Sequence, residues 1–131
     1  MLCIAAGSGI TPVLSIARSL LVREPDSRVT LVYGNRSSAS VMFAEVIEDL
    51  KNRHLGRFAV IHLLSREAQD IPLLTGRITG EKLKELAGGL IDVGTVDEAF
   101  LCGPEAMIGE ARTALATLGL PAERIRTELF K

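Results

Sequence analysis

The sequence predicts an α/β domain with a doubly wound, five-stranded parallel sheet, and three observations predict it. Short apolar runs alternate with helical patterns of about 10–15 residues, which implies right-handed crossovers and parallel strands. The 131 residues suit one domain, 1–131, with a core of its own. Apolar residues make up 47% of the chain and its mean hydropathy is +0.29, and both values argue against disorder.

The first half of the chain contains three expected strands and two expected helices. In order, they are a strand at 2–6, a helix at 12–23, a strand at 29–34, a helix at 39–53 and a strand at 58–64. The strands are short apolar runs, whereas apolar residues recur with the helical period in the two helices. Pro25-Asp26-Ser27 marks the turn after the first helix.

The second half begins with a looser stretch, 65–79, and then resumes the alternation. The expected elements are a helix at 80–88, a strand at 97–102, a helix at 104–118 and a strand at 124–130. Gly88-Gly89 ends the first of these helices, and Gly119-Leu120-Pro121 turns the chain after the second. In such a sheet the ligand lies beyond the carboxyl ends of the strands, where the strand order reverses. Candidate site residues are therefore expected immediately after each strand.

The segment Gly7-Ser8-Gly9-Ile10-Thr11-Pro12 follows the first strand and opens the first helix. Glycines allow the backbone to approach a ligand closely, and a helix N-terminus offers unpaired N–H groups and a positive dipole end to an anion. Thr11 can add a hydroxyl, and Pro12 suits the first helical turn, where no N–H is required. The segment predicts a phosphate or pyrophosphate site; a plain two-glycine turn is the alternative.

This segment matches neither standard phosphate-binding motif. The loop of nucleoside triphosphatases ends in Gly-Lys-Ser/Thr, which is absent. The dinucleotide fingerprint requires a third glycine where Pro12 stands, and an acidic residue after the second strand. That strand ends Tyr33-Gly34-Asn35-Arg36, without an acid. The phosphate hypothesis therefore depends on the layout of strand, glycines and helix.

Polar or small residues also follow the other strands. Ser65-Arg66 supplies a hydroxyl and a guanidinium that suit a terminal phosphate; a solvated loop arginine is the alternative. Asn35-Arg36 can hold a ribose or a phosphate, or can be a turn Asn and a surface Arg. In Cys102-Gly103-Pro104, Gly103 permits close approach of a flat ring. Cys102 either presents a polarisable sulfur to that ring or packs in the core.

Charge and cysteine content exclude several classes of protein. The net charge of −1 gives no indication of a nucleic acid or membrane partner, and no apolar stretch reaches the roughly 20 residues of a membrane span. Cys3 and Cys102 are expected to be reduced thiols, because no secretory signal is visible, and a cytoplasmic location is expected. His54 and His62 lie far from both in sequence, so no metal site is expected. Because Met1 leads directly into a core strand, we expect a piece of a longer protein.

Several of these segments together resemble the nicotinamide-nucleotide domain of the ferredoxin–NADP reductase family. The most specific pair is the glycine segment with Cys102-Gly103-Pro104-Glu105-Ala106-Met107. Tyr33-Gly34-Asn35-Arg36, Ser65-Arg66 and the run from Glu123 to Phe130 follow the family's order, so the resemblance covers essentially the whole chain. The run 63–80 is similar to that of reductases serving the phenylacetyl-CoA epoxidase complex. The resemblance implies a Rossmann-like domain of the ferredoxin reductase type.

The resemblance also implies a function and partners. Related reductases carry a flavin-binding barrel before this domain and, in this subgroup, a plant-type ferredoxin domain after it; the motifs of both are absent here. The implied enzyme is an NADPH-dependent oxidoreductase that passes electrons through FAD and a 2Fe-2S centre to an oxygenase. The fragment alone would be inactive without the flavin domain. A nucleotide-binding module without catalysis is the alternative, whereas a hydrolase is disfavoured because neither a Ser-His-acid set nor a Gly-x-Ser-x-Gly elbow is present.

Site residues are carried over from the family by position. The implied cofactor-binding residues are Gly7, Ser8, Gly9, Thr11, Pro12, Asn35, Arg36, Ser65, Arg66, Arg77, Gly103, Pro104, Met107 and Phe130. Among these, Ser65 and Arg66 take the 2′-phosphate of NADPH, with Arg77 near it, and Phe130 lies against the flavin. Cys102 and Glu128 are the implied catalytic residues: the first lies beside the reactive carbon of the nicotinamide, and the second makes a polar contact with the reacting groups.

Overall fold

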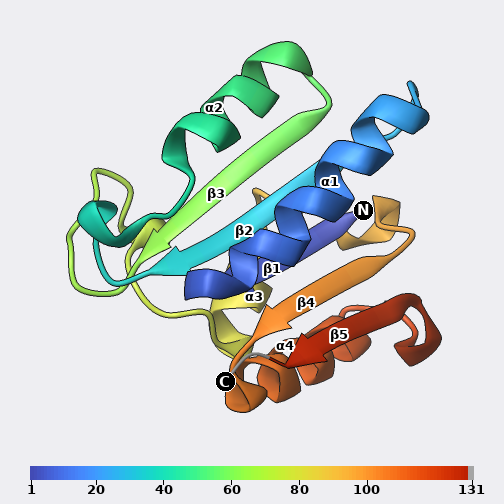
Figure 1. Cartoon of the computed structure of the whole chain (residues 1–131). Coiled ribbons are helices and arrows are strands. Elements are labelled where there is room, and N and C mark those ends of the chain that lie inside the picture. The colour runs from blue at the N-terminus through green and yellow to red at the C-terminus, as the bar shows by residue number, and fades with distance from the viewer. Residues whose placement is uncertain (130–131) are drawn as a thin grey trace.

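Five parallel strands form the centre of the molecule, in the order β3-β2-β1-β4-β5 (Figure 1). They are β1 (Leu2–Ala6), β2 (Val29–Asn35), β3 (Phe58–Leu64), β4 (Ala99–Gly103) and β5 (Ile125–Leu129). The structure, a computed structural model, describes residues 1–129. The chain builds outward from β1 to β3, then returns to the other side of β1 for β4 and β5. The order therefore reverses between β1 and β4, and the predicted fold class is confirmed.

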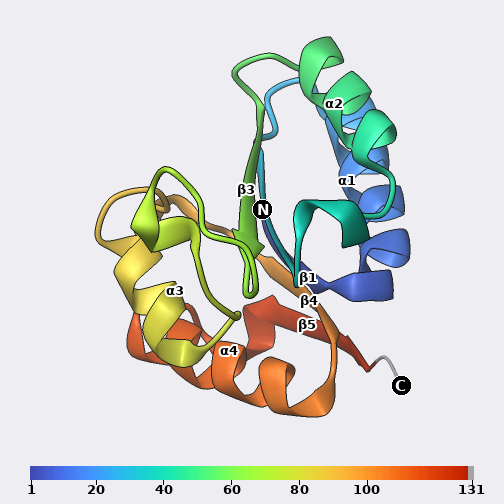
Figure 2. The same cartoon turned by 90° about the vertical axis from the view of Figure 1, so that its left-hand side faces the viewer.

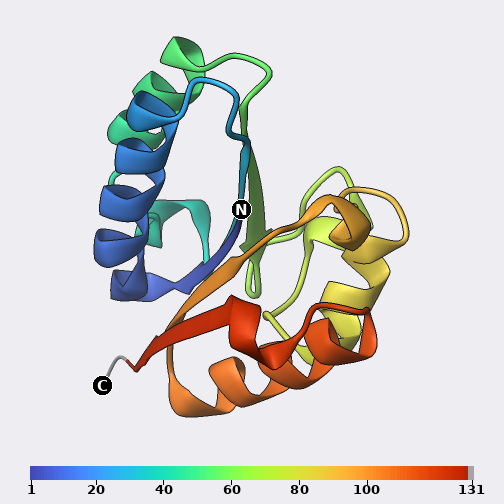
Figure 3. The same ribbon diagram turned by 90° about the vertical axis from the view of Figure 1, so that its right-hand side faces the viewer.

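Helices cover both faces of this sheet, as the two side views show (Figures 2 and 3). The helices are α1 (Ile10–Arg23), α2 (Ala44–Arg53), α3 (Gly80–Ala87) and α4 (Glu105–Thr117). Because side chains alternate between the faces of a strand, Cys3 and Tyr33 lie on the α1 and α2 side, whereas Ile4 and Val32 lie on the α3 and α4 side. Two apolar cores result, one on each face of the sheet.

The first helix begins at Ile10, two residues earlier than the sequence predicts. Residues Gly7–Gly9 form a 3-10 turn (η1) that runs directly into α1. Pro12 therefore lies in the first turn of the helix, where its missing N–H removes no intrahelical hydrogen bond. The β1 strand, the glycine turn and α1 form one continuous strand-to-helix connection, as the sequence predicts.

The second helix begins at Ala44, so the predicted start at residue 39 is wrong. Residues Ser38–Ser40 form a separate 3-10 turn (η2), in which the Ser40 hydroxyl bonds to the backbone of Ser37. Serine side chains that bond to nearby backbone compete with helix formation. Phe43, just before α2, adopts the left-handed conformation with φ 59°, which breaks the helical path.

The remaining boundaries agree with the predicted ones to within two residues, and those of β1 and β3 coincide with them. Helices α3 and α4 end at Ala87 and Thr117, and the strand predicted at 97–102 is β4 at Ala99–Gly103. The shorter 3-10 turns of the second half are η3 (Pro72–Leu74), η4 (Val93–Thr95) and η5 (Ala122–Arg124). The predicted last strand reaches Phe130, which lies outside the described residues. No helix within residues 1–129 has the length and apolar character to cross a bilayer.

Candidate functional site

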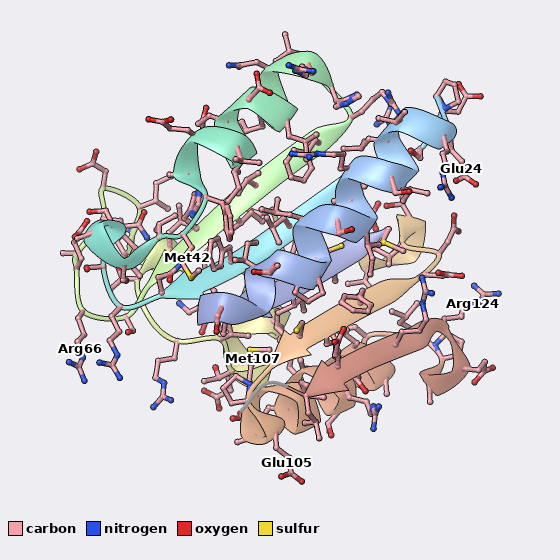
Figure 4. The ribbon with its side chains drawn as sticks, in the orientation of Figure 1. Glu24, Met42, Arg66, Glu105, Met107 and Arg124 are labelled. Atoms are coloured by element: carbon pink, nitrogen blue, oxygen red, sulfur yellow. The ribbon has the colours of Figure 1, made fainter. Side chains whose placement is uncertain are left out.

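A cavity of about 1030 Å³ lies at the carboxyl ends of the strands, where the strand order reverses. Its walls come from the glycine turn, the ends of β2 and β3, the segment that leads into α3, and the start of α4. Figure 4 shows Arg66 and Met107 on this side of the molecule, whereas Glu24 and Arg124 lie at the opposite end. One site thus gathers residues that are far apart in the sequence.

Many of the residues predicted from the sequence meet in this cavity. Those that line it are Gly7, Ser8, Asn35, Arg36, Ser65, Arg66, Arg77, Pro104 and Met107. The predicted residues that do not line it are Gly9, Thr11, Pro12, Cys102, Gly103 and Glu128. Of the second group, Gly9, Cys102 and Gly103 are buried directly behind the cavity wall, while Thr11 and Glu128 are exposed. Phe130 lies outside the described part of the chain.

The two glycines of the turn are needed for different reasons. Gly7 has φ +55°, a conformation that L side chains rarely adopt, but a Cβ there would meet open space. Gly9 has an ordinary φ, but a Cβ there would lie 2.4 Å from the backbone oxygen of Cys102. The turn is therefore pressed against the end of β4. Gly7 lines the cavity, and Gly9 allows the close contact between the glycine turn and the end of β4 at the switch point.

Three arginines face the same space without protein partners. Arg36, Arg66 and Arg77 all line the cavity, and no side-chain hydrogen bond or ion pair within residues 1–129 involves their guanidinium groups. Their loops are tied together, because the backbone N–H of Arg66 donates to the carbonyl of Arg36 at 2.8 Å. Guanidinium groups clustered around a cavity suit a ligand with several phosphate groups.

Asn35 adds an unpaired donor beside these arginines. Its Nδ2 atom is buried and has no hydrogen-bond partner among the described residues. Buried amide groups in proteins are almost always paired, so an orphan that borders a cavity marks a place for a ligand acceptor. Beside it, Gly34 lies under Ile78, whose Cδ1 atom would be 2.8 Å from a Cβ at Gly34. This contact brings the segment with Arg77 over the end of β2.

The loop from Ser65 to Thr79 is held by internal hydrogen bonds, although its sequence predicts only a loose stretch. The Gln69 side chain donates to the carbonyls of His62 and Leu74. The Lys82 ammonium, from α3, donates to the carbonyls of Leu73 and Thr75 at 2.9 and 3.0 Å. These contacts fix the loop backbone near Arg66 and Arg77. The spacing of apolar residues in the sequence does not indicate them.

The two predicted catalytic residues are neighbours on adjacent strands. Cys102 on β4 is the register partner of Glu128 on β5, so both side chains lie on the same face. Burial, and to a lesser degree the negative charge of Glu128, raises the pKa of the Cys102 thiol. A thiol that stays protonated at neutral pH is a poor nucleophile. A protonated Cys102 thiol is therefore better suited to orienting a ligand or packing in the core than to covalent catalysis.

Several cavity residues escaped the sequence reasoning. They are Ala6, Ser40, Gly76, Ile78, Thr79, Ala106 and Glu110. Glu110 could have been found, because it follows Met107 by one helical turn on α4; its carboxylate accepts the N–H of Gly80 at 3.2 Å. No group of His, Cys, Asp and Glu residues in the described range, 1–129, could hold a metal ion.

Comparison with known proteins shows the family of this chain. The family described as "Oxidoreductase NAD-binding domain" matches residues 3–113. A component of the 1,2-phenylacetyl-CoA epoxidase of Escherichia coli K12 is 50% identical over 129 residues, which cover 98% of this chain and 36% of that protein. The ferredoxin reductase component of the 3-ketosteroid-9-alpha-monooxygenase of Mycobacterium tuberculosis is 37% identical, covering 99% of this chain and 33% of that protein.

A solved structure shows the same architecture. The cytochrome P450 reductase of Amycolatopsis superposes with a TM-score of 0.83 at 28% identity, covering 99% of this chain and 37% of that one. The chain thus spans about a third of the length of the curated relatives that it matches. In each comparison, nearly all of this chain corresponds to one part of a longer protein.

Proposed function

This chain belongs to the family of oxidoreductase NAD-binding domains, and we propose that it binds NADPH as the nucleotide-binding part of a larger flavin-dependent reductase. The observation that carries the proposal is the cavity at the switch point, which combines the glycine turn, an orphaned Asn35 amide and three unpaired arginines. A pyrophosphate suits the turn, and an additional phosphate suits the arginines.

Each part of the cavity has a proposed role. Gly7 and Ser8, at the start of α1, hold the pyrophosphate, with Thr11 and Pro12 completing the first helical turn. Arg66 with Ser65 holds the 2′-phosphate, and Arg77 and Arg36 add positive charge around it. The buried Nδ2 of Asn35 donates to a ribose or phosphate oxygen. These groups orient the dinucleotide across the edge of the sheet.

The nicotinamide end is proposed to lie at the start of α4. Pro104 and Met107 line the cavity there, with Met107 as an apolar contact for a flat ring, and Gly103 lies buried beside Met107. A Cβ at Gly103 would lie 2.7 Å from Cε of Met107, so a larger residue there would displace this side chain. Cys102 and Glu128 are proposed to orient the ring, the first as a neutral thiol.

Bound NADPH would supply a hydride to FAD in the parent reductase, from which electrons would pass through a 2Fe-2S centre to an oxygenase. The flavin and ferredoxin domains are proposed to belong to the same parent chain, where Phe130 would lie against the flavin. The relatives named above are components of oxygenase systems, and phenylacetyl-CoA epoxidase is the proposed acceptor. The runner-up is a nucleotide-binding module without catalysis of its own.

Calorimetric titration of the chain with NADP⁺ and NAD⁺ tests the proposal. We expect NADP⁺ to bind more tightly, by about tenfold or more, because a charged hydrogen bond to phosphate contributes about 1.5–3 kcal/mol. Equal affinity for the two nucleotides would show that the site does not recognise the 2′-phosphate. Absence of binding by both would refute the nucleotide site altogether.

A further inference from the structure

Tyr33 is the one tyrosine of the chain, and it is completely buried near the end of β2. Its hydroxyl makes two hydrogen bonds, and both are to backbone. It donates to the carbonyl of Gly7 at 3.2 Å and accepts the N–H of Met42 at 3.2 Å. The hydroxyl thereby joins two loops that follow neighbouring strands, the glycine turn after β1 and the segment before α2.

Both loops have a left-handed backbone conformation next to these hydrogen bonds. Gly7 itself is left-handed, and Phe43, directly after Met42, is the non-glycine residue with positive φ among residues 1–129. A left-handed conformation costs a non-glycine residue about 1–2 kcal/mol. The Phe43 side chain is 43% exposed, so burial of the ring offsets little of this cost. The Tyr33 hydroxyl is a local contact that holds both conformations.

The hydrogen bond to Gly7 also contributes to where the next N–H points. The Gly7 carbonyl accepts two donors, the Tyr33 hydroxyl and the backbone N–H of Ile10, and the Tyr33 hydroxyl is the one that comes from outside the turn. The carbonyl of Gly7 and the N–H of Ser8 belong to one planar trans peptide, so they point in opposite directions. With the carbonyl directed to Tyr33, the Ser8 N–H is directed away from Tyr33, and Ser8 lines the cavity. Because Gly7 is a glycine, the reverse orientation of this peptide is sterically accessible. It would turn a carbonyl oxygen toward a bound anion.

We propose that Tyr33 is a positioning residue that sets the orientation of the Gly7–Ser8 peptide, so that its N–H and not its carbonyl faces a bound pyrophosphate. The inference rests on the proposed function, because it assumes an anion at this turn. Tyr33 acts through the backbone and touches no ligand. Its role therefore concerns the pyrophosphate and not the phosphate held by Arg66.

Two ligands separate these parts of the site. NADP⁺ contains both phosphate groups of interest, whereas 2′-AMP contains the 2′-phosphate and no pyrophosphate. In Tyr33→Phe we expect NADP⁺ affinity, measured by calorimetry, to fall about fivefold, the effect of one neutral hydrogen bond, while 2′-AMP affinity changes less than about twofold. Ser27→Ala is the matched control, since it also removes a partly buried hydroxyl that donates to a carbonyl, that of Leu20, but at the other end of the sheet. It should leave both affinities unchanged.

A second measurement uses the wild-type chain and does not depend on the variant folding. With tyrosine labelled at Cζ with ¹³C, Tyr33 gives one NMR signal, whose shift reports the hydrogen bonds of its hydroxyl. We expect NADP⁺ and inorganic pyrophosphate to move this signal, and 2′-AMP to leave it in place.

The outcomes separate the inference from the proposed function. Equal NADP⁺ affinity of Tyr33→Phe and wild type, or a signal that pyrophosphate does not move, would overturn the role of Tyr33 and leave the nucleotide site standing. A parallel loss for NADP⁺ and 2′-AMP would also overturn it, since this would indicate general damage. If wild type binds NADP⁺ and NAD⁺ with equal affinity, the NADPH preference fails while the ratio of NADP⁺ affinities still decides the role of Tyr33. If wild type does not bind NADP⁺, the proposed function and this inference fail together.

Discussion

The two ends of the sheet use arginine in opposite ways. At the amino end, Arg57 stands immediately before β3 and its guanidinium donates to the carbonyls of Leu21, Glu24 and Ser27 at 2.8–3.0 Å. At the carboxyl end, Arg36 and Arg66 line the cavity without side-chain partners among residues 1–129. The last carbonyls of a helix lack intrahelical donors, and Arg57 supplies donors at the end of α1. It thereby links the end of this helix to the start of β3.

This difference shows how the same residue type serves stability or binding. A guanidinium whose donors are satisfied by the protein has nothing left to offer a ligand. One that faces a cavity unpaired stabilises nothing until an anion arrives. The two roles therefore occur at different ends of the sheet. Substitution of the arginine at the amino end should change the free energy of unfolding, and substitution of the arginines at the carboxyl end should change nucleotide affinity.

The largest effect is expected for Arg57→Ala. Removing the guanidinium takes a donor from three carbonyls. That of Glu24 keeps the N–H of Ser27, whereas those of Leu21 and Ser27 lose the partner described above, so the free energy of unfolding should fall by about 2–3 kcal/mol. Urea denaturation followed by circular dichroism measures this loss. NADP⁺ affinity of the folded variant should be unchanged. A stable Arg57→Ala chain would show that water replaces the guanidinium and would break the comparison.

Arg66→Ala is the matched substitution at the carboxyl end. It should weaken NADP⁺ binding by about tenfold, or roughly 1.5 kcal/mol, and leave NAD⁺ binding nearly unchanged. The free energy of unfolding should change by less than about 0.5 kcal/mol, because the side chain is exposed and has no partner within the described residues. Calorimetry and urea denaturation of the same preparation test both halves. Equal losses for NADP⁺ and NAD⁺ would assign Arg66 a role other than 2′-phosphate recognition.

The sequence was sufficient to predict the sheet and much of the cavity. Apolar runs and glycine turns predict the strands and the switch point, because both follow from local pattern. The start of α2 was missed, since Ser37 and Ser40 form a local turn that periodicity does not reveal. Gln69 and Tyr33 were missed for a different reason. Their hydrogen bonds join residues that become neighbours only after folding, so no spacing in the sequence indicates them.

The two cysteines give a smaller, pH-dependent effect. Burial raises the pKa of Cys3 from 9.0 to about 12 in the folded protein. An unfolded chain therefore releases this proton first, so the stability due to Cys3 is complete below pH 9 and decreases as the pH rises toward 12. At pH 10 the loss is about 1.4 kcal/mol relative to neutral pH.

Cys3→Ala tests this effect, because alanine has no proton to release. The slope of unfolding free energy against pH between about 9 and 11, measured by urea denaturation, should be shallower than that of wild type. An identical slope would show that Cys3 does not titrate differently in the two states. Cys102 has a raised pKa for the same principal reason, so Cys102→Ala should reduce the slope as well.

The smallest effect is the most direct test of the comparison, because the chain offers a glycine of the same conformation at each end. Gly7, at the carboxyl end, has φ +55°, and Gly56, in the turn before β3 at the amino end, has φ +80°. A Cβ meets nothing within 4 Å at either position. Either substitution by alanine should therefore lower the free energy of unfolding by about 1 kcal/mol, because alanine is held in a left-handed conformation.

The two glycines should differ only in binding. Gly7→Ala places a methyl group at the cavity wall, in the space proposed for the pyrophosphate, and should weaken NADP⁺ binding by at least the roughly fivefold expected for Tyr33→Phe. Gly56→Ala should bind NADP⁺ as wild type does. Because the stability losses are matched, any difference in affinity belongs to the position of the methyl group and not to strain. Equal affinities would place the pyrophosphate elsewhere and would remove the functional half of the contrast between the two ends of the sheet.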